Sequence, residues 1–158
     1  MKTYDRTLAV NYAQKHALSP NPNFYHFGAV GGDCTNFISQ CLLSGGCEMV
    51  FNKEHGWYYI SSSNRSYSWT GVAQLQSFLL SPATGGPRAK ICTLEELEIG
   101  DIIQLRQNKT HFNHTLFVSK IQNSEIFVCA HSNDALNRKL SSYPYQQLLP
   151  LHILYADN

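Results

Sequence analysis

Apolar residues recur at helical spacing in three stretches of the chain. Positions i, i+3 and i+4 lie on one face of a helix, and Gly or Pro soon afterwards ends it. This spacing predicts helices over residues 5–16, 33–43 and 70–80, which are followed by Pro20, Gly45 and Pro82. The apolar positions are Leu8, Ala9, Tyr12 and Ala13, then Cys34, Phe37, Ile38, Cys41 and Leu42, then Val72, Leu75, Phe78 and Leu79.

Short apolar runs separated by turns fill the second half of the chain. The runs cover residues 102–105, 115–118, 126–130 and 151–155, and a capping-box spacing from Thr93 to Glu96 predicts a helical turn before them. Residues 56–69 have no clean period, so we expect irregular or short-strand structure there, and a loop at 84–87. Helices first and strands afterwards predict an α+β domain, with N-terminal helices packed on a C-terminal antiparallel sheet.

Length and charge narrow the class of protein. A chain of 158 residues is typical of a single domain, here residues 1–158. Lys and Arg total 12 against 11 for Asp and Glu, so the formal charge of +1 does not favour a nucleic-acid partner. No stretch approaches the roughly 20 apolar residues of a membrane helix. We therefore expect a soluble globular domain with neither a nucleic-acid nor a membrane partner.

The cysteines and the first residues bear on where the chain acts. Five cysteines cannot all pair within one chain, and the first six residues lack the charged-then-apolar profile of a secretory signal. We expect free thiols in a reducing compartment. The location is then cytoplasmic, or outside the cell by a non-classical route, unless the chain is one domain of a longer protein. Nothing in the pattern indicates an oligomeric state.

One thiol stands at the start of a predicted helix. Gly31 and Gly32 precede Asp33, which is suited to capping the helix, and Cys34 then lies in the first turn. The positive end of the helix dipole favours a thiolate there, and the free amides can hold an oxyanion. Asn36 or Gln40 is the candidate side chain for the same oxyanion. An alternative of equal weight is that Cys34 only begins the apolar stripe of the helix.

Two histidines lie at the ends of predicted strands. The period of two places His114 on one face with Leu116 and Val118, where we expect it to meet the start of the packed helix as a base for Cys34. The alternative is a core histidine. His131 follows the next strand and is the preferred acceptor for the His114 ring. Asn133 and Asp134 are the other candidates for this third position.

Six separated motifs now support a resemblance. They read GGDCTNFISQ (31–40), GWYY (56–59), WTGV (69–72), GDIIQ (100–104), HTLFV (114–118) and AHSND (130–134). In this order they resemble the bacterial putative amidase domain family, which is similar to the NlpC-type and CHAP cysteine hydrolases. The resemblance spans residues 4–140. It implies a papain-like (NlpC/CHAP-type) fold with Cys34 as nucleophile, His114 as base and His131 as the orienting residue. NlpC-type enzymes usually place that third residue earlier, where this chain has Cys129.

The remaining candidates concern ligands. Asp33, Trp57 and Trp69 are the candidates for substrate contacts, since flat rings beside Tyr58 and Tyr59 suit a peptide or glycan. The alternative is that these rings cover the sheet and the helix edge. A Zn²⁺ site could draw on His111, His114, Cys129 and His131, but without a Cys-x-x-Cys pair we expect no metal and no cofactor.

Three functions follow from the residues and the resemblance. The first is a cysteine amidase or peptidase that hydrolyses peptide amide bonds, with peptidoglycan stem peptides as the implied substrate. The second is a non-catalytic peptide- or glycan-binding module on the same fold. The third is an acyltransferase that uses the same residues, which the sequence does not separate from hydrolysis.

Overall fold

The computed structural model describes residues 3–28 and 32–155, so Gly31 of the first motif lies outside the described residues. Its helices are α1 (Arg6–His16), α2 (Cys34–Ser44), α3 (Tyr67–Thr70) and α4 (Val72–Leu80), with short 3₁₀ helices η1 (Leu94–Glu96) and η2 (Leu140–Ser142). Its strands are β1 (Tyr59–Ser61), β2 (Asn64–Arg65), β3 (Pro87–Ile91), β4 (Ile102–Arg106), β5 (His114–Gln122), β6 (Glu125–Ala130), β7 (Ala135–Lys139) and β8 (Gln147–Tyr155).

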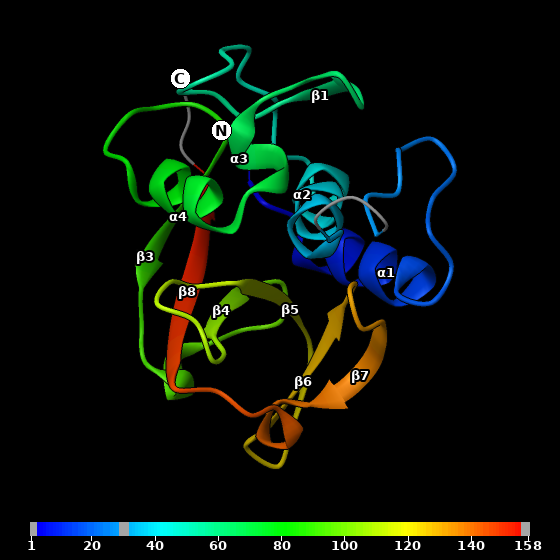
Figure 1. Ribbon diagram of the computed structural model, residues 1–158. Coiled ribbons are helices and arrows are strands. Elements are labelled where there is room, and N and C mark those ends of the chain that lie inside the picture. Colours follow the sequence, from blue (N-terminus) through cyan, green and yellow to red (C-terminus); the bar gives the residue numbers. More distant parts are fainter. Residues whose placement is uncertain (1–2, 29–31, 156–158) are drawn as a thin grey trace.

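Six of the strands form one antiparallel sheet in the order β3-β8-β4-β5-β6-β7, and β1 pairs with β2 alone. Figure 1 shows α1 to α4 gathered on one side of the molecule, with most of the large sheet below them. The predicted α+β class with an antiparallel sheet is therefore confirmed. None of the helices in the described ranges is both long and apolar enough to span a membrane.

Alternation along the central strands divides the core into two parts. On β5, Phe117 packs with α2 in the helix-side core, whereas Leu116 and Val118 belong to a far-side core under η2. The same alternation holds on β4, where Ile102 faces the helices and Ile103 faces away. Successive side chains of a strand point to opposite faces. Residue parity on β5 therefore decides which side chains can meet the start of α2.

The structure differs from the predicted elements at three places. The predicted helix over 70–80 is split, because Gly71 takes an extended conformation (φ −102°, ψ 129°) between α3 and α4. Two strands were missed, β3 and β7, which form the two edges of the sheet. Edge strands bury fewer residues, so neither carries a continuous apolar run, and β3 begins at Pro87, which is compatible with an edge.

The motif at residues 100–104 ties α1 to the sheet through Asp101. The carboxylate is fully buried, and its Oδ1 accepts from Arg6 Nη1 on α1 at 2.7 Å and from the Ile153 amide on β8 at 2.9 Å. Oδ2 accepts from the Glu98 amide at 2.8 Å and lies 3.0 Å from His152 Nδ1. A buried carboxylate needs such partners to be tolerated.

We expect Asp101→Ala to lower the free energy of unfolding by about 3 kcal/mol, because it leaves the Arg6 guanidinium and the amides of Glu98 and Ile153 without their acceptor. Urea titration at pH 7 measures this change. Glu98→Ala is the matched control, since its side chain is 59% exposed, and we expect a change within about 0.5 kcal/mol. Equal losses in the two variants would contradict the role given to Asp101.

Candidate functional site

The site begins at the residue before α2. Asp33 stands at the N-cap, but its carboxylate makes no capping bond to the helix and instead turns to the side. It accepts from the Phe27 amide at 2.7 Å and from Asn36 Nδ2 at 2.9 Å, both through Oδ1, and Oδ2 lies 2.6 Å from His131 Nδ1. Only 1% of Asp33 is exposed. This carboxylate therefore joins the preceding loop, the first turn of α2 and the end of β6.

His131 is held at both ring nitrogens. Nδ1 faces the Asp33 carboxylate, and Nε2 lies 2.8 Å from the main-chain carbonyl of His16. Both partners only accept hydrogen bonds, so both nitrogens must donate, which makes the ring a cation. The ring also stacks on Phe37, with centroids 4.1 Å apart.

Hydrogen bonds outweigh burial in this pair. Burial disfavours the charge of His131, yet the bonds to Asp33 and to the His16 carbonyl and the carboxylate charge hold its pKa above the usual value. Burial likewise opposes the charge of Asp33, but the bonds from His131, Phe27 and Asn36 lower its pKa. At neutral pH the two residues form a buried ion pair.

Cys34 is the first residue of α2 and is partly buried. Its Sγ lies 3.7 Å from Thr35 Oγ1 and against the backbone amide of Thr115 on β5. Burial raises the pKa of the thiol, and the bonds from Thr115 and Thr35 offset only part of this effect, while the Asp33 charge adds to it. The expected lowering of the pKa by the helix dipole is therefore wrong, chiefly because burial disfavours the thiolate, and the Asp33 charge adds to this effect.

A polar network holds the helix start against the sheet. Thr35 Oγ1 lies 3.1 Å from Thr115 Oγ1, and Gln104 Nε2 on β4 donates to the Thr115 hydroxyl at 3.4 Å. Gln104 also donates to the Val72 carbonyl at the start of α4, at 3.0 Å. Thr115 is thus the β5 side chain that meets the start of α2.

His114 lies on the other face of β5. It shares that face with Leu116 and Val118, as predicted, but this face looks away from α2. The ring centroid is 6.2 Å from that of Tyr143, and burial, aided by the Arg138 charge, lowers the pKa of His114 to about 4. Within the described part of the chain, no hydrogen bond joins the ring to Cys34 or to His131. The expectation that His131 accepts from His114 is wrong, because Asp33 and His16 occupy both nitrogens of His131.

The other candidates for the third position lie in the turn after β6. Asn133 and Asp134 are exposed, and Asn133 has a positive φ of 32°. The neighbouring Ser132, which the sequence did not single out, accepts from the Asp33 amide through Oγ at 2.7 Å. This turn therefore fixes the residue that precedes Cys34.

The predicted substrate residues are core residues. Trp57 and Trp69 are 0% exposed, and their indole N–H groups donate to Ser39 Oγ at 3.1 Å and to Asn36 Oδ1 at 2.9 Å. Asp33 is equally enclosed. None of the three offers surface to a substrate, so the structure supports the alternative of covering rings as far as α2 is concerned, where both tryptophans are buried.

The side chains considered for the oxyanion are also engaged. The Asn36 amide group donates to the Tyr25 carbonyl and to Asp33, and Gln40 Oε1 accepts from Tyr12 at 2.5 Å. The Asn36 donor is thus used within the fold, whereas the Gln40 bond occupies only its acceptor oxygen. The main-chain amides of the first turn of α2 are further candidate donors to an oxyanion.

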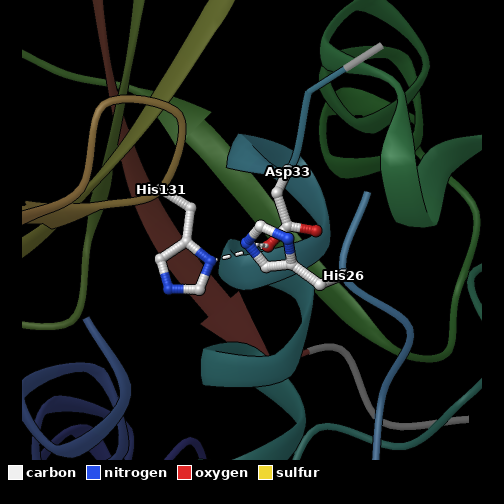
Figure 2. Close-up of side chains that lie close together, drawn as sticks. All are labelled: His26, Asp33 and His131. Atoms are coloured by element: carbon white, nitrogen blue, oxygen red, sulfur yellow. Dashed lines mark hydrogen bonds and ion pairs between the residues drawn. The ribbon is translucent and has the colours of Figure 1, made fainter. Parts of the chain in front are cut away.

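The structure assembles a different group of possible metal ligands from the one considered on sequence. His26, Asp33 and His131 present ligand atoms that all lie within 4.8 Å of one another. Figure 2 shows the three side chains converging beside α2, with His26 coming from the preceding loop. The sequence had indicated His111, His114, Cys129 and His131 as possible metal ligands. Of these, only His131 belongs to this group. His26 gave no signal in the sequence, because it lies in a loop without periodicity.

Comparisons with known proteins place these residues in a family context. A family model described as "Putative amidase domain" matches residues 3–154. The chain is 36% identical over 139 residues to the uncharacterized protein YhbB of Bacillus subtilis, covering 85% of this chain and 43% of the relative. It is 31% identical over 147 residues to the uncharacterized protein YjcM of the same organism, covering 87% and 33%. The chain thus spans less than half the length of these relatives. No solved structure matches significantly.

We expect the lowered pKa of His114 to make stability depend on pH. The unfolded chain takes up this proton first, so the free energy of unfolding falls as the pH drops from about 6.5 towards the folded value of about 4. Between pH 7 and pH 5 the parent should lose about 2 kcal/mol more than His114→Gln in urea titrations at each pH. Identical pH dependence in the two proteins would contradict a buried neutral His114.

Proposed function

Because the chain belongs to the putative amidase domain family, we propose that it hydrolyses amide bonds with Cys34 as nucleophile and His114 as proton acceptor. The observation that carries the proposal is the place of Cys34, at the first position of α2 with its Sγ against the Thr115 amide at the start of β5. The substrate that we propose is a peptide amide, as in the stem peptides of peptidoglycan.

The proposed reaction has two steps. Sγ attacks the carbonyl carbon while its proton passes to the imidazole of His114, and that proton then goes to the leaving amine as the C–N bond breaks. Water attacks the resulting thioester, gives up a proton to the same imidazole and releases the carboxylic acid and the thiol. The main-chain amides of the first turn of α2, which have no partner within the helix, are the proposed donors to the tetrahedral oxyanion.

Two features support His114 as the proton acceptor. Its pKa of about 4 keeps the ring neutral at pH 7 with a free lone pair, and transfer of the proton from a thiol of raised pKa requires the ring to leave the buried position that lowers its pKa. It also stands at the first position of β5, directly before the residue whose amide meets Sγ. The proposal requires the ring to move from the Tyr143 side of β5 towards Cys34 when substrate binds, which means that the main chain at the first residue of β5 must turn.

We expect Cys34→Ala to lower the rate of amide cleavage by about a thousandfold or more, because the covalent route is lost. Mass spectrometry of purified peptidoglycan fragments, incubated with each protein, measures the cleavage. Cys92→Ala is the matched control, since Cys92 is also a partly exposed thiol. Cleavage by Cys34→Ala at the parent rate would rule out this nucleophile.

The same assay tests the acceptor. His114→Ala should lower the rate by about 10²- to 10⁴-fold, as loss of a general base does. If His114→Ala kept the parent rate while Cys34→Ala was inactive, a group other than His114 would be the proton acceptor. Transfer of the acyl group to an added amine would identify the protein as an acyltransferase acting through the same thioester.

A second candidate function is a binding module without catalysis. The observation that favours it is that the thiol pKa is raised and the His114 ring lies on the far side of β5, so nucleophile and base are not in contact.

Acid quenching of the protein during incubation with peptidoglycan fragments separates the two functions. Because the resting Cys34 thiol has a raised pKa, activation should show only with substrate, as an acyl group held on Cys34 through a thioester. Peptide mapping detects this group, and Cys34→Ala should lack it. Fragments that bind the protein, stay uncleaved and leave Cys34 unmodified would favour the binding module.

A further inference from the structure

We propose that His26, Asp33 and His131 form a binding site for one divalent transition-metal ion, for which Zn²⁺ is the probe. The three side chains offer Nε2, a carboxylate oxygen and Nδ1, and these atoms lie within 4.8 Å of one another (Figure 2). Two imidazoles and one carboxylate are a common ligand set for such ions, with a further position left for water. This inference does not rest on the proposed function, because Cys34 is not among the ligands.

Outer hydrogen bonds orient two of the three ligands. His131 directs Nε2 to the His16 carbonyl, which leaves Nδ1 pointing at the centre of the cluster. Asp33 has its Oδ1 engaged by the Phe27 amide and by Asn36, which leaves Oδ2 for the same centre. Ligating histidines usually donate their other N–H to a carbonyl or carboxylate in this manner. The pattern is thus that of a prepared site, and the polar partners are buried.

The third ligand, His26, is reachable from solvent and can adjust its position. His26 Nε2 lies 3.7 Å from Asp33 Oδ2, and its side chain is 45% exposed, whereas Asp33 and His131 are each 1% exposed. Ligand atoms around a tetrahedral zinc lie about 3.3 Å apart. The His26 contact is already close to that distance, and an exposed side chain on a loop can move by the remainder.

Metal binding must displace a proton. Nδ1 of His131 now donates to Asp33 Oδ2 at 2.6 Å, so the ion takes the place of that hydrogen. One proton is released for each ion bound, and the carboxylate exchanges an imidazolium partner for the metal. The imidazole of His131 is then neutral, with Nδ1 bound to the ion, and it still donates from Nε2 to the His16 carbonyl. His26 keeps its charge, but its Nδ1 accepts from the Gly28 amide at 3.3 Å, so the ring proton on Nε2 must move to Nδ1 before Nε2 binds the ion.

Competition between the protein and a chromophoric chelator for added Zn²⁺ tests the site. The reduced full chain should bind one Zn²⁺, and His26→Ala should weaken this binding at least about tenfold. The variant should keep the parent fold, because His26 is partly exposed. His55→Ala is the matched control, since His55 is 84% exposed and lies far along the chain beside Glu54. We expect parent affinity in this control.

Two further measurements separate the cluster from the thiols. Cys34→Ser should bind Zn²⁺ with the parent affinity, and the spectrum of the protein loaded with Co²⁺ should lack the thiolate charge-transfer bands of a cysteine ligand. Parent affinity in His26→Ala, or loss of binding in Cys34→Ser, would overturn the proposal. These experiments measure metal binding and not catalysis, so their outcome does not depend on whether the chain cleaves amides.

Discussion

The candidate site depends on one buried charge, the carboxylate of Asp33. With 1% exposure it requires donors from the protein, and it takes them from the loop at Phe27, from Asn36 on α2 and from His131 at the end of β6. Removing the charge from water without them would cost far more than the fold can tolerate. Satisfying this charge fixes the residue that precedes Cys34, so the position of the thiol follows from the needs of its neighbour.

The same charge shapes the chemistry of the thiol. A helix start ordinarily favours a thiolate, but here burial raises the pKa of Cys34 and the adjacent carboxylate adds to the effect. The protein therefore holds a protonated thiol beside a buried ion pair and keeps the His114 imidazole neutral on the far side of β5. The thiol and the imidazole are thus both uncharged at rest and lie on opposite sides of β5.

Much of the architecture could be predicted from sequence because its signals are local. The helical stripes predicted α1 and α2 closely, and the Thr93 to Glu96 spacing predicted η1, where the Thr93 amide donates to Glu96 at 3.0 Å. The central strands followed from apolar runs that are buried on both faces. The edge strands β3 and β7 were missed because an edge needs no such run.

The sequence by itself determined the helix that begins at Cys34 and the parity that groups His114 with Leu116 and Val118. Only the tertiary structure decided which face of β5 meets that helix, because a period of two is the same whichever face is covered. It also brought His131 to Asp33 across 98 residues and set His26 beside them. Contacts between distant segments depend on how buried charges are satisfied in three dimensions. The local spacing of residues in the sequence does not predict those contacts.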